Sequence, residues 1–193
     1  MPTKTAPKRS VSLREALLAL PHWPLGPDDA NRPDAQGYID RAELVRDVEG
    51  VTSCFEFGGH YGWGLATWIH TFPGITRVGW CDNEGAFEGS NQACYENVLA
   101  ATTGQLAVEW FTNAGQCVDR QYDLVMVDGD HGHGATLIDL ALALAMRPKV
   151  IVVDDMQLGG PNQAVHDFAN YTGLTFDLFP AAAGTARFLL EDN

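Results

Sequence analysis

Five short runs rich in β-branched and aromatic residues alternate with stretches of helical periodicity, and this alternation constrains the fold more than any other feature of the chain. It is typical of parallel strands joined by crossover helices, because two parallel neighbours need a connection of about a dozen residues or more. The predicted strands are residues 51–57, 76–81, 106–111, 122–127 and 149–153. The sequence therefore predicts a doubly wound, mostly parallel α/β sheet of the Rossmann-like class.

Helices are predicted between these strands and on both sides of the series. They cover residues 12–20, 38–48, 64–71, 89–101, 134–146 and 162–171. Two further short runs, residues 175–179 and 185–190, predict a C-terminal hairpin that adds an antiparallel strand. Because 193 residues fit one domain, we expect residues 38–193 to form it, preceded by a tail, a short helix and a Pro-rich loop within residues 1–37.

Composition and cysteine spacing indicate the compartment. With 46% hydrophobic and 19% charged residues, the chain has the composition of a soluble globular protein. No run approaches the roughly 18 apolar residues that a membrane span needs. The four cysteines lie far apart and form neither a zinc-ribbon nor a disulfide pattern: Cys54, Cys81, Cys94 and Cys117. We therefore expect a cytoplasmic protein with buried thiols.

The formal net charge of −13 narrows the class of ligand. An acidic surface repels phosphate backbones, so nucleic acid is a poor candidate for the substrate. We expect a small-molecule substrate and no membrane partner, and the sequence leaves open whether the chain forms a homo-oligomer.

Polar residues follow the predicted strands, and in open α/β sheets ligands bind at these carboxyl ends. The first strand leads into Glu56-Phe57-Gly58-Gly59-His60-Tyr61-Gly62, where glycines permit a tight turn and bring backbone amides close to a ligand. The later strands end in Asp82, in Thr112-Asn113, in Asp128-Gly129-Asp130-His131 and in Asp154-Asp155.

The order of these motifs resembles the class I S-adenosylmethionine-dependent methyltransferases. Glu56-x-Gly58-x-x-x-Gly62 looks like the family's first motif, in which the glycine turn, here with Gly59 and His60, lies against the methionine end of the cofactor. Asp82 is similar to the acid that accepts hydrogen bonds from both ribose hydroxyls. The resemblance implies cofactor contacts from Asp128 as well, and an adenine contact from Asn113, where relatives often have aspartate.

Within that superfamily, the Asp128-Gly129-Asp130-His131 run followed by Asp154-Asp155 resembles O-methyltransferases that act on small-molecule hydroxyls. In their metal-dependent members the corresponding acids hold magnesium, so the resemblance implies Mg²⁺ or another divalent cation at Asp128, Asp154 and Asp155. His131, beside the first of these, is the candidate catalytic base, since imidazole titrates near neutral pH. His133 is an alternative, because this chain lacks the Ser-Tyr pair that many relatives carry after the run.

Two other functions remain open at this stage. One is a binding module that holds S-adenosylmethionine without catalysing transfer. The other is an NAD-dependent oxidoreductase, which shares a glycine-rich turn and an acid after the second strand. The glycine spacing disfavours the oxidoreductase, because G-x-G-x-x-G is absent from the sequence.

Overall fold

The computed structural model describes residues 11–22, 35–84, 88–179 and 184–190. The predicted tail at residues 1–10 lies outside this part of the chain, as do Pro24, Pro27 and Pro33 of the predicted Pro-rich loop. Among the described residues, no helix combines the length and the apolar character that crossing a bilayer requires.

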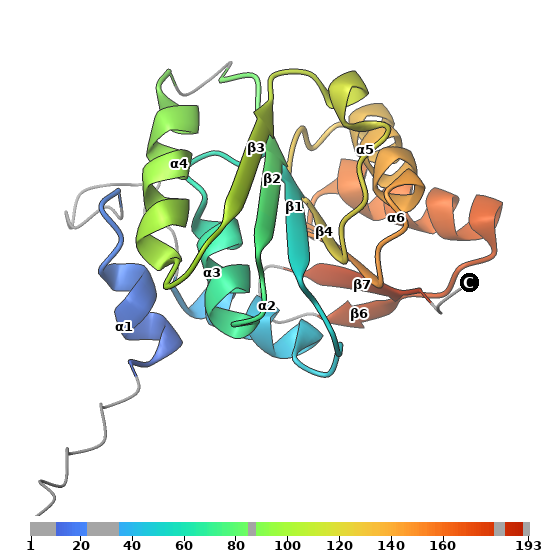
Figure 1. Cartoon of the computed structure of the whole chain (residues 1–193). Coiled ribbons are helices and arrows are strands. Elements are labelled where there is room, and N and C mark those ends of the chain that lie inside the picture. Colours follow the sequence, from blue (N-terminus) through green and yellow to red (C-terminus); the bar gives the residue numbers. More distant parts are fainter. Residues whose placement is uncertain (1–10, 23–34, 85–87, 180–183, 191–193) are drawn as a thin grey trace, which may run out of the picture.

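The strands described here form one sheet of seven, in the order β3-β2-β1-β4-β5-β7-β6 (Figure 1). β1 to β5 run parallel, whereas β7 is antiparallel to both β5 and β6. The mostly parallel sheet and its antiparallel C-terminal hairpin are thus confirmed. The strands are β1 (Ser53–Phe57), β2 (Arg77–Cys81), β3 (Ala107–Phe111), β4 (Leu124–Val127), β5 (Val150–Val153), β6 (Asp177–Phe179) and β7 (Thr185–Leu189).

Helices cover both faces of this sheet, so the molecule has three layers (Figure 1). One face carries α1 (Leu13–Leu18), α2 (Ala35–Val45), α3 (Trp63–Thr71) and α4 (Ser90–Ala101). The other carries α5 (His133–Ala145) and α6 (Gly159–Thr172). Successive strand residues alternate between the two cores: Cys54 packs under the first set of helices and Phe55 under the second. Such strands are buried on both sides, which explains their continuous apolar runs.

The order of the strands places a crevice between β1 and β4. The chain runs outward from β1 through β2 to β3 and then returns to β4, on the other side of β1. The connections on the two sides of this point lead away in opposite directions, which leaves space at the carboxyl ends of the strands.

Every predicted helix and strand has a counterpart, but several details differ from the sequence prediction, among them α2, which begins and ends three residues earlier than expected. A short 3-10 helix, η1 (Ala114–Cys117), was not predicted, and α6 begins at Gly159 rather than at residue 162. Pro161 fits the first turn of α6, where a backbone N–H has no partner within the helix. Of the four thiols expected to be buried, Cys81 is partly exposed, because β2 ends at a cavity.

Candidate active site

A cavity of about 640 Å³ opens at the carboxyl ends of β1 to β4. Its walls come from the turn after each of these strands, so residues far apart in the sequence face one space. Seven of the predicted cofactor residues line it: Glu56, Gly58, Gly59, His60, Asp82, Asn113 and Asp128. The eighth, Gly62, is not part of this wall and instead precedes the first residue of α3.

The glycine turn after β1 is packed too tightly for side chains. Gly58 has a φ of +83°, and a Cβ there would lie 2.1 Å from the carbonyl oxygen of Asp128. A Cβ at Gly64 would lie 2.3 Å from a carboxylate oxygen of Glu56. The glycines therefore bring the β1 turn against the end of β4 and bring the start of α3 against Glu56.

Glu56 is a buried carboxylate with one oxygen left unsatisfied. Its side chain is held by the backbone N–H of Leu65, in α3, yet its Oε2 has no hydrogen-bond partner within the described part of the chain. Burial, together with the Asp128 carboxylate, raises the pKa of Glu56 well above its ordinary value. A cationic group in the cavity would stabilise both carboxylates.

Asp82 connects the end of β2 to the glycine turn. Its Oδ2 accepts a hydrogen bond from the backbone N–H of His60 at 2.7 Å, and its Oδ1 accepts one from the N–H of Glu84 at 2.7 Å. A carboxylate has about four acceptor positions, so two remain for a ligand in the cavity. Asp82 therefore combines a structural role in the turn with the capacity to bind a pair of hydroxyl groups.

Asn113 lines the cavity but its oxygen already serves the local fold. The side chain caps η1 by accepting a hydrogen bond from the backbone N–H of Gly115 at 2.8 Å. Asn113 is also exposed. The predicted adenine contact at this position consequently rests on an oxygen that a backbone amide already uses.

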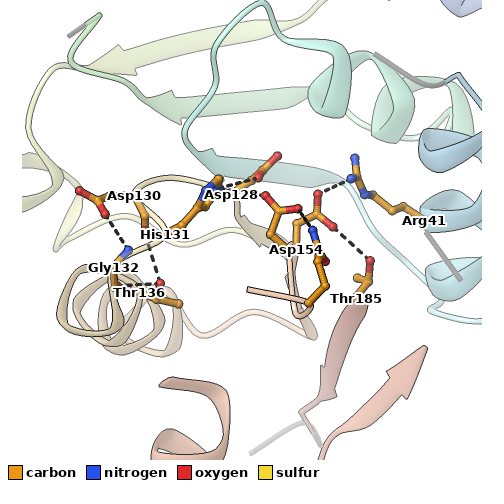
Figure 2. A network of polar contacts seen from close by, with 10 residues as sticks. Arg41, Asp128, Asp130, His131, Gly132, Thr136, Asp154 and Thr185 are labelled. Carbon is orange, nitrogen blue, oxygen red and sulfur yellow. Dashed lines mark hydrogen bonds and ion pairs between the residues drawn. The ribbon is translucent and has the colours of Figure 1, made fainter. Parts of the chain in front are cut away.

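The buried guanidinium of Arg41 lies at the end of β5, beside Asp154. Arg41, from α2, forms an ion pair with Oδ2 of Asp154, and Thr185 of β7 donates a hydrogen bond to Oδ1 at 3.2 Å (Figure 2). The Asp154 side chain is only 3% exposed. Burial and the Asp128 carboxylate raise the pKa of Asp154, whereas Arg41 opposes that rise. Both oxygens of this carboxylate are therefore engaged by protein groups.

Asp128, His131 and Asp155 form a second polar cluster beside this pair. The His131 Nε2 atom lies 3.9 Å from Oδ1 of Asp128 (Figure 2). The same atom lies 3.0 Å from Oδ2 of Asp155. One ligand atom from each of the three residues lies within 4.8 Å of the other two. The neighbouring carboxylates of Asp128 and Asp155 raise the pKa of His131.

These two clusters bear differently on the predicted magnesium site. Asp128 and Asp155 are partly exposed oxygen donors, as Mg²⁺ prefers, and His131 adds a nitrogen. They fit a divalent cation. Asp154 does not fit as a third ligand, because Arg41 already supplies a positive charge to it and Thr185 holds its other oxygen.

The two candidate histidines face different surroundings. His131 lines the cavity, whereas the Nε2 atom of His133 lies 2.9 Å from Oδ2 of Asp167 in α6. This hydrogen bond connects α5 to α6, and His133 is not part of the cavity wall. The structure therefore brings only His131 close to the predicted cofactor residues.

Several residues of this region were not predicted from the sequence. Tyr38 and Arg41 come from α2, Thr185 from β7 and Asp139 from α5. Tyr38 and Asp139 line the cavity, and the Arg41 guanidinium lies 4.8 Å from the centre of the Tyr38 ring. None of these residues follows a strand, so a search for polar residues at the carboxyl ends of predicted strands does not find them.

Comparisons with known proteins identify the fold. No protein-family model matches the sequence, and no curated protein is similar to it at a significant level. The O-methyltransferase TomG from Streptomyces achromogenes, involved in tomaymycin synthesis and solved with S-adenosylmethionine, superimposes with a TM-score of 0.64 and 20% identity over 96% of this chain and 92% of its own.

Two further structures extend this likeness. The methyltransferase PaMTH1 from Podospora anserina, solved with S-adenosylhomocysteine, has a TM-score of 0.67 and 14% identity over 92% of this chain and 88% of its own. A candidate RNA methyltransferase from Pyrococcus horikoshii has a TM-score of 0.64 and 15% identity over 92% of this chain and 96% of its own. The chain therefore has the fold of the class I S-adenosylmethionine-dependent methyltransferases.

Proposed function

We propose that this protein transfers a methyl group from S-adenosylmethionine to a hydroxyl group of a small molecule. The observation that carries the proposal is the convergence, in one cavity, of the tightly packed glycines Gly58 and Gly59, the unsatisfied Oε2 of Glu56 and the carboxylate of Asp82. These groups match the cationic methionine end and the ribose hydroxyls of that cofactor.

The electrostatics of the cavity support a cationic ligand. Glu56 and Asp128 face the same space from opposite sides of the crevice, and each raises the electrostatic cost of ionising its neighbours. A ligand with an ammonium and a sulfonium group would relieve this repulsion. NAD carries two phosphates, which such a wall would repel, so the oxidoreductase alternative gains no support.

The chemistry asks little of the protein beyond positioning and removal of one proton. When bound, S-adenosylmethionine supplies a methyl group whose S–C bond breaks as the acceptor oxygen forms its new O–C bond, leaving S-adenosylhomocysteine. His131 is placed to accept the hydroxyl proton, because it lines the cavity beside Asp128.

A divalent cation would be held by Asp128, His131 and Asp155, and it would act as a Lewis acid that lowers the pKa of the acceptor hydroxyl. In that state His131 would be a ligand rather than the base. The Arg41–Asp154 pair would remain outside this set.

A small-molecule acceptor is favoured by charge. The chain carries a formal net charge of −13, and the described cavity is lined by several carboxylates, both unfavourable for a polyanionic substrate. The fold by itself does not determine the acceptor, because substrate loops vary independently of the sheet.

Ligand-induced stabilisation tests the cofactor assignment. We expect S-adenosylhomocysteine at about 100 times its Kd to raise the unfolding free energy by about 2.7 kcal/mol, which corresponds to a Tm increase of about 5–10 °C in a protein of this size. NAD at the same concentration should leave the Tm unchanged. Stabilisation by NAD but not by S-adenosylhomocysteine in differential scanning fluorimetry would refute the methyltransferase proposal. Stabilisation without transfer to any of a panel of phenols, catechols and sugars would favour a binding module.

The paired histidines allow a matched test of the base. We expect His131→Ala to lower kcat about 100-fold, because a positioned general base contributes about 10²- to 10⁴-fold. The Kd of S-adenosylhomocysteine should change less than about threefold. His133→Ala is the control: it removes a partly exposed pair with Asp167 and should leave kcat within about twofold. Equal losses in the two variants, measured by formation of S-adenosylhomocysteine, would contradict the assignment.

A further inference from the structure

One wall of the cavity contains a carboxylate that the proposed chemistry does not use. Asp139 lies on the second turn of α5 and lines the cavity together with Cys81, Ala114 and Gly129. Cys81 ends β2, Ala114 follows β3 and Gly129 follows β4, so this wall spans the carboxyl ends of these strands next to Asp82. Within the described part of the chain, no hydrogen-bond donor reaches the Asp139 carboxylate.

Gly129 keeps this carboxylate open to the cavity. A Cβ at position 129 would lie 3.0 Å from Oδ2 of Asp139, so a side chain there would crowd the carboxylate. The neighbouring Asp130 uses its Oδ1 to accept a hydrogen bond from the backbone N–H of Gly132 at 2.7 Å (Figure 2). Asp130 thus serves its own loop, whereas Asp139 is available to a ligand.

The electrostatic state of Asp139 also indicates a missing partner. Burial and the nearby Asp130 carboxylate raise its pKa to about 6. A partly buried carboxylate without a hydrogen-bond donor lowers the stability of the fold, and a ligand that supplies the donor would offset this cost.

We propose that Asp139 accepts a hydrogen bond from the 6-amino group of the adenine ring and thereby selects adenine over 6-oxo purines. The inference rests on the proposed function, since it assigns a recognition residue within the same cofactor cavity. It replaces Asn113 as the acceptor: Asn113 is exposed, its oxygen is neutral, and the cap of η1 already uses one of the two lone pairs of that oxygen.

The chemistry of the two purines predicts that the site prefers adenine to hypoxanthine. The 6-amino group of adenine donates hydrogen bonds, so it complements an ionised carboxylate. Hypoxanthine presents a carbonyl oxygen at the same position, which would face the carboxylate with no proton between them. A site built around a ligand's donor rejects the analogue that lacks it.

Binding of two nucleosides to matched variants tests this assignment. Isothermal titration at pH 8 would compare S-adenosylhomocysteine with its 6-oxo analogue, S-inosylhomocysteine, for the native protein, Asp139→Ala, Asp139→Asn and Asn113→Ala. We expect the native protein to prefer the adenine compound by about 100-fold or more. Asp139→Ala should bind it about 10- to 100-fold more weakly and lose most of the preference, since a hydrogen bond to a charged group is removed.

The two remaining variants separate recognition from folding. Asp139→Asn should bind the 6-oxo compound better than the native protein does, because its amide can rotate to donate. Asn113→Ala should keep the native preference. Unchanged base preference in both Asp139 variants, or its loss in Asn113→Ala, would overturn the proposal. Failure of the native protein to bind S-adenosylhomocysteine at all would instead refute the proposed function.

A pH series of the unliganded protein gives an independent readout. The groups facing Asp139 are Asp130 in the loop after β4, Cys81 in β2 and Cys117 in η1. A carboxyl whose pKa is raised in the folded state binds its proton more tightly there, so its ionisation lowers stability as the pH rises from about 4 to above 6. Asp139→Asn removes this cost, and its Tm should exceed the native Tm by a few degrees at pH 8 and by less at pH 4. A lower Tm at pH 8 would contradict the absence of a donor.

Discussion

Replacing Arg41 with Ala will lower the free energy of unfolding by about 3 kcal/mol or more at neutral pH. The Arg41 and Asp154 side chains are only 11% and 3% exposed, and removal of Arg41 leaves a carboxylate buried beside Asp128 and Asp155. Breaking a buried ion pair in this way typically costs about 3–5 kcal/mol, because the remaining carboxylate must either stay ionised without its partner or bind a proton. Urea unfolding without added divalent cations measures the change.

Two control variants isolate the charge. Arg41→Lys keeps a cation on α2 and should lose less stability than Arg41→Ala. The double variant Arg41→Ala with Asp154→Asn removes both charges and should recover part of the loss. If Arg41→Ala costs less than about 0.5 kcal/mol, the pair contributes no more than an exposed salt bridge does.

The same variant probes the cation site. In Arg41→Ala, Oδ2 of Asp154 loses its partner near Asp128 and Asp155, and we expect millimolar Mg²⁺ to raise the Tm of this variant more than that of the native protein. Equal Mg²⁺ responses would show that Arg41 does not compete with a divalent cation for Asp154.

Replacing Asp82 with Ala will weaken binding of S-adenosylhomocysteine by about 100-fold or more. The carboxylate has two acceptor positions left after binding the amides of His60 and Glu84, and two charge-assisted hydrogen bonds to ribose contribute about 1.5–3 kcal/mol each. Loss of the His60 contact adds to the effect, because it frees one end of the glycine turn. Isothermal titration gives the two dissociation constants.

Asn113→Ala is the matched control for this loss. Asn113 lines the same cavity, but it is exposed and its oxygen serves η1, so we expect less than a threefold change in Kd. A circular dichroism spectrum of Asp82→Ala would establish that the sheet is intact. A change of less than fivefold in Asp82→Ala would mean that ribose is bound elsewhere.

The fold could be predicted because its signals are local. Apolar runs such as residues 122–127 appear as strands since both faces of a parallel sheet are covered, and the acids that follow them lie at one edge. Asp82 and Asp128 were found because they follow predicted strands, and Glu56 because it precedes the glycine turn; their roles came from the family resemblance, and all three line the cavity. The unpredicted η1 begins after Asn113, whose capping role depends on a turn too short to leave a periodic pattern.

By itself, the sequence determined the order of the elements, the direction of the hairpin and the acids that gather at the carboxyl ends of the strands. Tertiary structure alone decided which of those acids are free to bind a ligand. Asp154 is paired with Arg41, 113 residues away, while Asp139 faces the cavity from a helix. The physical reason is that hydrophobic periodicity shows which face of a helix or strand is buried. It does not show how α2 and α5 pack against the ends of the sheet, and these contacts depend on that packing. A charged residue on a helix carries no local sign of the carboxylate or cavity that packing places beside it.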